Sequence, residues 1–157
     1  MDLNEARKLA EELIALHAPD GWTFSWSQSK TSFGECLYWG RRIVLSHPLT
    51  RVNNLDHVKD TLLHEIAHAN CPGAGHGPKW RAEARRLGAI PLAAKHGEMA
   101  PARYVLVCPR CQGAAGLFYR RPTVRRSCKK CGPPRFDPDF AMTPRQARAD
   151  EVLEIRA

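Results

Sequence analysis

Apolar residues recur with a helical period at the start of the chain and again near its middle. Residues 3–17 place their apolar side chains near one helical face. Residues 55–70 repeat the pattern, and Asn54 before them is a residue type that caps helix N-termini. A third helix is expected to start at Pro78 and stop at Gly88, because proline suits a first turn and glycine a helix end. The pattern therefore predicts three helices.

Between the first two helices the pattern changes to that of strands. Residues 22–27 alternate large apolar and small polar side chains. Residues 35–40 and 41–47 form two more short strand patterns, which meet at Gly40. Three short strands this close in sequence predict a small antiparallel sheet packed on the second helix. The expected fold class is therefore α+β.

Changes in composition divide the chain into three segments. A connector with proline and alanine at 89–104 separates the helical part from a cysteine-rich part. We therefore expect a main domain at 1–98, a small module at 99–136 and a C-terminal tail at 137–157. The tail is expected to contain a short helix at 144–155.

Composition is that of a protein with a modest core. The chain has 157 residues, of which 43% are hydrophobic and 25% charged. No apolar run approaches the roughly 18 residues of a transmembrane helix, and the N-terminus lacks the basic start and apolar middle of a secretory leader. We expect a cytoplasmic protein with no membrane partner. In that reducing compartment, six cysteines favour metal ligation over disulfides.

The net charge of +8 is concentrated in one segment. Residues 1–98 hold 12 Lys and Arg against 11 Asp and Glu, and residues 137–157 hold 3 against 5. Residues 99–136 hold 9 basic residues and no acidic one. Charge segregated in this way indicates a polyanionic partner.

His64, Glu65 and His68 form an H-E-x-x-H pattern inside the second predicted helix. Residues four apart lie on the same helical face, so the two histidines can present imidazoles to one zinc ion. Glu65, one position further on, can approach a water bound to that ion. Such a site hydrolyses an amide without a covalent intermediate. Zinc polarises the carbonyl, and Glu65 takes the water proton and passes it to the leaving amine.

A catalytic zinc needs a third protein ligand and an open fourth position. His76 is favoured because the Gly-Ala-Gly turn before it can return the chain to the metal, and Glu83 and His96 are the alternatives. Cys71 could instead fill the fourth position, which would make the zinc structural. Hydrolysis of a small amide, with Cys36 as an upstream ligand, is a further alternative. Without a metal, the histidines would be ordinary surface residues.

Four other cysteines form two C-x-x-C pairs with 16 residues between them. This spacing is a strong signal for a closed, tetrahedral, structural zinc site, so we predict a zinc ribbon. Phe118 and Tyr119 lie next to a series of arginines at 120–126, so bases could stack there while arginines contact phosphates. The expected zinc ligands are Cys108, Cys111, Cys128 and Cys131. The expected nucleic-acid-binding residues are Arg110, Arg120, Arg121, Arg125, Arg126, Lys129 and Lys130.

The chain resembles the SprT-like family of Spartan-type zinc metalloproteases, in the form of its small bacterial or phage members. The resemblance rests on "DTLLHEIAHA" and "GHGPKW", on the strand region "WTFSWSQSKTSFGECLYWGRRIVLSHPLT", and on "YVLVCPRCQG" with "SCKKCG". It implies a zincin-like α+β fold, Glu65 as catalytic residue and His76 as third ligand. The stretch from His68 to His76 is shorter than in the Spartan type, and the eukaryotic partner-binding tails are missing, so Spartan-type regulation is not implied.

Together these features predict a zinc-dependent endopeptidase directed to DNA, which hydrolyses proteins bound or crosslinked to DNA and serves crosslink repair. Glu65 would activate a zinc-bound water. We expect two zinc ions, one catalytic at His64, His68 and His76 and one structural in the ribbon. We also expect a monomer that binds single-stranded or duplex DNA without sequence specificity. The alternative is a nucleic-acid-binding regulatory zinc protein whose H-E-x-x-H site is structural or inactive.

Overall fold

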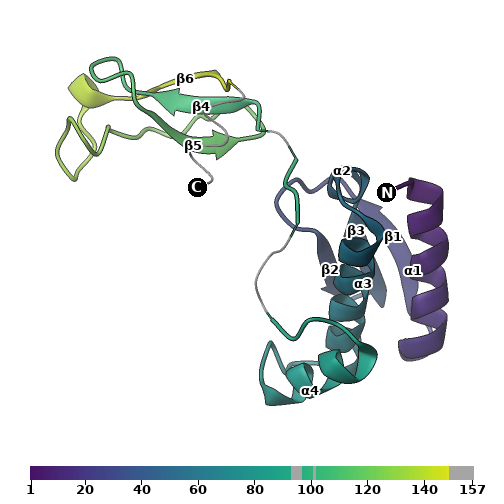
Figure 1. Cartoon of the computed structure of the whole chain (residues 1–157). Coiled ribbons are helices and arrows are strands. Elements are labelled where there is room, and N and C mark those ends of the chain that lie inside the picture. The colour runs from purple at the N-terminus through teal and green to yellow at the C-terminus, as the bar shows by residue number, and fades with distance from the viewer. Residues whose placement is uncertain (93–96, 101, 149–157) are drawn as a thin grey trace. The chain divides into compact units, whose positions relative to one another are not determined.

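The computed structural model describes residues 1–92, 97–100 and 102–148. The chain forms two compact units, Met1–Ala100 and Pro101–Ala157, each with its own three-stranded sheet (Figure 1). The division lies two residues beyond the position expected from composition. Helices and small sheets together make the fold α+β, as predicted. In the described part of the chain, no helix is both long and apolar enough to cross a membrane.

The described part of the first unit contains α1 (Leu3–His17), α2 (His47–Val52), α3 (Leu55–Asn70) and α4 (Pro78–Leu87). The three predicted helices are α1, α3 and α4. The Asn54 side chain accepts a hydrogen bond from the backbone N–H of His57 at 3.0 Å and so caps α3. Gly88 ends α4 with a left-handed φ of 85°. The short α2 was not predicted; the hydroxyl of Ser46 caps it by accepting from Leu49 N–H.

The first sheet contains β1 (Thr23–Ser27), β2 (Gly34–Leu37) and β3 (Arg42–Ser46), in the order β1-β3-β2. β2 and β3 are antiparallel, but β1 runs parallel to β3, so the prediction of an antiparallel sheet is wrong. The short turn at 38–41 folds β2 directly onto β3. The longer loop at 28–33 carries the chain past β3 to the far edge first, which leaves β3 in the centre.

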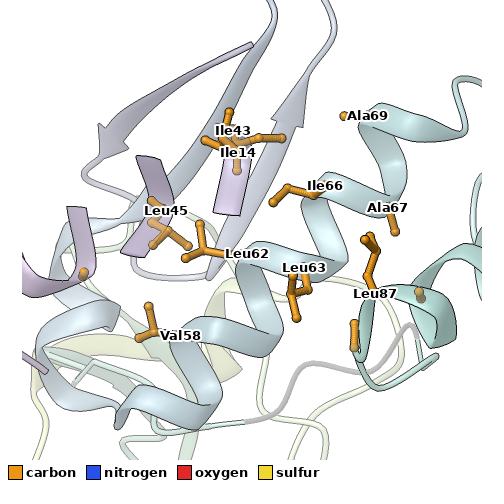
Figure 2. Close-up of a cluster of buried hydrophobic side chains, with 14 of the residues drawn as sticks. Ile14, Ile43, Leu45, Val58, Leu62, Leu63, Ile66, Ala67, Ala69 and Leu87 are labelled. Carbon is orange, nitrogen blue, oxygen red and sulfur yellow. The ribbon is translucent and has the colours of Figure 1, made fainter. Parts of the chain in front are cut away.

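Helix α3 is held on several sides by the hydrophobic core. It contacts β2 and β3, and it also contacts α1 and α4 (Figure 1). Its buried side chains meet those of Ile14 on α1, Ile43 and Leu45 on β3, and Leu87 on α4 (Figure 2). The core residues that α3 itself contributes are Val58, Leu62, Leu63, Ile66, Ala67 and Ala69. The helix that carries the H-E-x-x-H pattern therefore has a fixed rotation about its axis.

The second unit is a three-stranded antiparallel sheet. It contains β4 (Tyr104–Val107), β5 (Ala114–Phe118) and β6 (Thr143–Gln146), in the order β5-β4-β6. A single turn of 3-10 helix, η1 (Pro138–Phe140), precedes β6. The central strand β4 contributes most of the buried apolar side chains, namely Val105, Leu106 and Val107.

Strand β6 corrects two expectations for the end of the chain. The helix expected at 144–155 is wrong where the chain is described, because residues 143–146 are extended and pair with β4. The chain from 137 to 148 is therefore part of the second unit rather than a separate tail. Pairing satisfies the N–H and C=O groups that β4 would otherwise leave open at its edge. Residues 149–157 lie outside the described part.

Candidate metal centres

Three imidazole rings converge at α3. His64 and His68 lie one turn apart on that helix, and His76 comes from the loop before α4. The Nε2 atom of His76 lies 3.1 Å from Nε2 of His64 and 3.0 Å from Nε2 of His68. Nitrogen ligands around one tetrahedral zinc stand about 3.3 Å apart, because each Zn–N bond is about 2.0–2.1 Å. The spacing of the three nitrogens fits a zinc ion.

The protonation of the rings also suits a metal. Burial and the neighbouring imidazoles lower the pKa of His64 to about 4, and burial and His76 lower the pKa of His68 to about 4. Both rings are therefore neutral at pH 7, and a neutral imidazole has the lone pair that a metal binds. The three histidines form a potential metal-binding site whose donors fit zinc.

Trp80 supports the three rings from α4. Its side chain is fully buried, and its ring stacks on that of His68 with an interplanar angle of 26°. The rings of His64 and His76 meet the indole edge to face, with centroids 4.6 Å and 4.5 Å away. The indole limits how far each imidazole can rotate.

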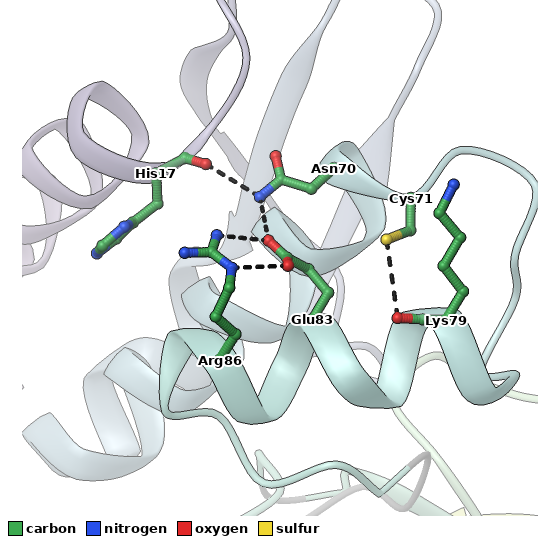
Figure 3. Close-up of polar contacts among 6 residues, drawn as sticks. All are labelled: His17, Asn70, Cys71, Lys79, Glu83 and Arg86. Atoms are coloured by element: carbon green, nitrogen blue, oxygen red, sulfur yellow. Dashed lines mark hydrogen bonds and ion pairs between the residues drawn. The ribbon is translucent and has the colours of Figure 1, made fainter.

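Cys71 does not close the site. It follows the last residue of α3, and its thiol lies 3.9 Å from the backbone oxygen of Lys79, to which it donates (Figure 3). It is not in the histidine group, whose donor atoms all lie within 4.8 Å of one another. The fourth position of a metal held by the histidines is therefore left without a thiolate.

The Glu83 carboxylate is engaged in hydrogen bonds away from the histidines. Its carboxylate accepts hydrogen bonds from the Arg86 guanidinium at 2.7 and 2.8 Å and from the Asn70 amide at 2.7 Å (Figure 3). These contacts lower the pKa of Glu83 to about 2. The Asn70 amide also donates to the backbone oxygen of His17, so the network joins α1, α3 and α4. Among the described candidates, only His76 joins His64 and His68 in one group of potential metal donors; His96 lies outside the described residues.

Glu65 lies beside the histidines, between α3 and β2. Burial, with a smaller contribution from the nearby Glu35, raises the pKa of its carboxyl to about 7, although the backbone N–H of Cys36 lowers this pKa by donating to the carboxylate. A carboxyl that titrates near 7 can accept and release a proton at neutral pH. A pocket of about 390 Å³ opens here, and Glu65 and all three histidines line it.

Cys36 lines the same pocket but is not a member of the histidine group. Burial raises the pKa of its thiol to about 12, with a smaller contribution from Glu65. The metal-free thiol therefore stays protonated at neutral pH. The arrangement with Cys36 as an upstream zinc ligand is not formed.

Replacing Glu65 with glutamine is expected to raise the Tm of the metal-free protein above pH 7 and to leave it almost unchanged near pH 4.5. The folded pKa of about 7 exceeds the ordinary 4.5, so folding becomes less favourable as pH rises through this window. The stabilisation at high pH is at most about 3 kcal/mol. Tryptophan fluorescence reports it, because all four tryptophans lie in the first unit. An equal Tm change at both pH values, or the same change in the exposed control Glu12→Gln, would contradict the prediction.

Gly34, at the start of β2, lies against α3 beside Glu65. A Cβ atom there would stand 2.8 Å from Cγ2 of Thr61 and 3.0 Å from Cγ of Glu65. Gly34→Ala is therefore expected to destabilise the first unit by about 1–3 kcal/mol, because two packed elements must separate. Thermal unfolding measures the loss. Adding Thr61→Ser, which removes the methyl group but keeps a hydroxyl, should recover part of it; no recovery would argue against this contact.

The second group of donors lies in the second unit. Cys108, Cys111, Cys128 and Cys131 have sulfur atoms within 4.8 Å of one another. The Sγ atoms of Cys111 and Cys128 are 3.7 Å apart, and thiolates around one tetrahedral zinc stand about 3.8 Å apart. Backbone N–H groups of Cys111 and Arg110 lower the pKa of Cys108 to about 7, which favours a thiolate. This group is also a potential metal-binding site that fits zinc.

With both groups of donors placed, comparison with known protein families gives one match. Residues 3–100 match the SprT-like family, and these residues are most of the chain. The chain belongs to the SprT-like family. A comparison with curated proteins found no match.

The SprT-like family is associated with metalloprotease-type domains. The match ends at residue 100, where the first unit ends, so it includes the three histidines and Glu65 but not the four ribbon cysteines. The family membership expected from the sequence is confirmed. Because the match does not cover the second unit of this SprT-like chain, the role of that unit is argued from its own residues.

The expected nucleic-acid-binding residues of the second unit are all exposed. In the described part of the chain, six of them take part in no ion pair, whereas the guanidinium of Arg110 lies 4.3 Å above the Phe140 ring. Phe140 also covers Gly132, at which a Cβ would stand 2.7 Å from Cβ of Phe140. Arg110 therefore packs across the two cysteine pairs in addition to being exposed.

Sequence reasoning missed two supports of the first site. The Cys36 backbone N–H that holds Glu65 and the Tyr38 hydroxyl that donates to the backbone oxygen of His68 at 2.9 Å both come from the β2 region. These contacts depend on how β2 packs against α3. Neither carries a local signal in the sequence.

Proposed function

We propose that the first unit is a zincin-like zinc endopeptidase domain and that the chain hydrolyses proteins bound or crosslinked to DNA. The observation that carries the proposal is the convergence of three imidazoles beside the half-buried Glu65, whose carboxyl has a pKa raised by burial to about 7. The pocket beside them offers room for a water and an extended polypeptide. Family membership supports the protease part of the proposal.

The chemistry divides between the ion and the chain. When bound, zinc polarises the scissile carbonyl and makes a coordinated water acidic enough to ionise near neutral pH. Glu65 accepts a proton from the attacking water at its carboxylate and delivers it to the amine nitrogen as the C–N bond breaks. The Cys36 N–H orients this carboxylate, and Trp80 orients the three imidazoles that would hold the ion.

The second unit is proposed to bring the protease to DNA. The seven expected nucleic-acid-binding side chains of its sheet and cysteine group are all exposed and cationic, and residues 99–136 contain no acidic residue. Phosphate contacts of this kind give affinity without sequence readout. We infer a monomer, located in the cytoplasm, that binds single-stranded or duplex DNA and carries two zinc ions. The alternative of a regulatory protein with a closed, inactive site gains no support from Cys71, whose thiol lies elsewhere.

The test compares one protein substrate in two states, crosslinked to DNA and free. The zinc-loaded full chain should cleave the crosslinked form at least about tenfold faster, because DNA raises the local concentration of substrate. Arg125→Ala/Arg126→Ala should weaken this preference, and the matched control Arg81→Ala/Arg85→Ala on α4 should keep it. No cleavage of either form would refute the protease, and equal cleavage of both would refute its direction to DNA.

A further inference from the structure

The turn between β2 and β3 projects a tryptophan into solvent. The strand pattern expected at 35–40 ends at Leu37, so Tyr38 and Trp39 lie in the turn. The Trp39 side chain is 95% exposed, whereas the other tryptophans of the chain are partly or fully buried. A backbone hydrogen bond of 3.2 Å from Arg41 N–H to the Tyr38 oxygen closes the turn, and Gly40 supplies its left-handed φ of 90°. The indole is therefore displayed on an ordered turn.

This turn is anchored at the rim of the histidine site. Tyr38 lines the pocket, and its hydroxyl donates to the backbone oxygen of His68 at 2.9 Å. Its ring also meets Trp22 edge to face, with centroids 6.1 Å apart. Two contacts on Tyr38 thus hold the residue next to Trp39. A molecule stacked on Trp39 would lie beside the opening of the pocket.

The charges next to the indole are positive. Arg41 and Arg42 follow Gly40, and both side chains are exposed. Arg41 donates to the backbone oxygen of Asp20 at 3.3 Å, a neutral acceptor that leaves its charge uncompensated. Among the described residues, ion pairs are found at Arg7–Glu11 and Arg86–Glu83. Neither Arg41 nor Arg42 takes part in an ion pair there. The turn therefore combines one exposed aromatic ring with two available cations.

A single indole is too small to dock a folded protein. It offers at most about 250 Å² of contact area, whereas a stable protein interface buries roughly 800 Å² on each partner. One ring is the right size for one unpaired base, and arginines beside it can contact the flanking phosphates. A base inside a duplex is already stacked on both faces. The pattern favours a single strand.

We propose that the β2–β3 turn of the first unit is a binding site for single-stranded nucleic acid, in which Trp39 stacks on a base while Arg41 and Arg42 contact the phosphates. This site goes beyond the DNA binding proposed for the second unit, and it does not require the protease to be active. It places a single strand at the rim of the pocket. The described part of the chain thus offers two separate contacts for nucleic acid.

The test follows a labelled oligothymidylate of roughly 16 nucleotides binding to the zinc-loaded full chain. Anisotropy measures affinity, and tryptophan fluorescence reports contact with Trp39. Wild type should show quenching. Trp39→Phe should lose the quenching but keep affinity within about threefold, because phenylalanine still stacks, and Trp39→Ala should bind roughly 5- to 100-fold more weakly. Wild-type affinity in Trp39→Ala, or no quenching in wild type, would overturn the proposal.

Two matched controls separate the turn from general effects. Leu16→Ala removes another exposed apolar side chain, on α1, and should leave binding unchanged. Arg42→Gln should reduce the salt dependence of binding by about one charge, and Lys8→Gln on α1 should not.

Equal quenching and affinity with a duplex of the same length would overturn the preference for single strands. Arg125→Ala/Arg126→Ala, in the second unit, should weaken binding but retain the quenching of Trp39, and loss of the quenching there would also count against the turn.

Discussion

Replacing Glu65 with glutamine is expected to lower kcat/KM for a DNA-crosslinked protein by about 10²- to 10⁴-fold, the usual contribution of a general base. Glutamine has nearly the same shape and can still lie beside the Cys36 backbone, but it cannot accept the water proton. Its amide is not among the metal donors, so zinc content should stay unchanged. Cleavage rate and metal content are measured on the same preparation.

The control for this substitution is Glu35→Gln. Glu35 lines the same pocket and raises the pKa of Glu65, but its side chain is exposed on β2. This variant should keep most of the activity, and its acid limb should move to lower pH because the Glu65 carboxylate loses a negative neighbour. If Glu65→Gln cleaves as fast as wild type while Glu35→Gln does not, the base has been assigned to the wrong carboxyl.

Substituting Cys128 and Cys131 together with serine is expected to unfold the second unit and leave the first one folded. The described part of the second unit buries few apolar side chains, mainly those of β4, so its sheet depends on the ion held by the cysteines. Structural zinc contributes about 10–16 kcal/mol to folding in comparable small domains. Amide hydrogen exchange should show loss of protection across β4, β5 and β6 and none across α3.

Cys36→Ser is the matched control, since it removes a thiol from the first unit and should leave β4 protected. Chelation of the wild type should reproduce the double substitution in the second unit. Continued protection of β4 in the double variant would mean that its strand pairing is stable without the ion. Loss of protection in α3 as well would mean that the two units fold as one.

The helices of the first unit were predictable because their signals are local. A helical period, a capping Asn54 and a terminating Gly88 act within a few residues of one another. The same holds for His64 and His68, which helix geometry places on one face. The C-x-x-C pairs are local in the same way, since a four-residue turn brings each pair of thiols together.

Strand pairing was less predictable because it is settled between distant segments. The sequence indicated strands near 22–27 and 41–47, but not that β1 would pair with β3 in parallel. The end of the chain was misassigned for the same reason. Residues 143–146 carry no strong strand pattern, and the open edge of β4 is what makes them extend.

Three features of this SprT-like chain could be recognised from its sequence. They are a helix with two imidazoles and a glutamate, a third histidine after a glycine turn, and a cysteine-rich basic module. Residue type and short spacing carry that information. The hydrogen bonds that hold Glu83 away from the histidines, the contact of Cys71 with Lys79 and the exposure of Trp39 could not be recognised in this way. Each depends on side chains from elements far apart in the chain, such as Asn70 and Arg86 occupying Glu83, and those meet only when the core packs.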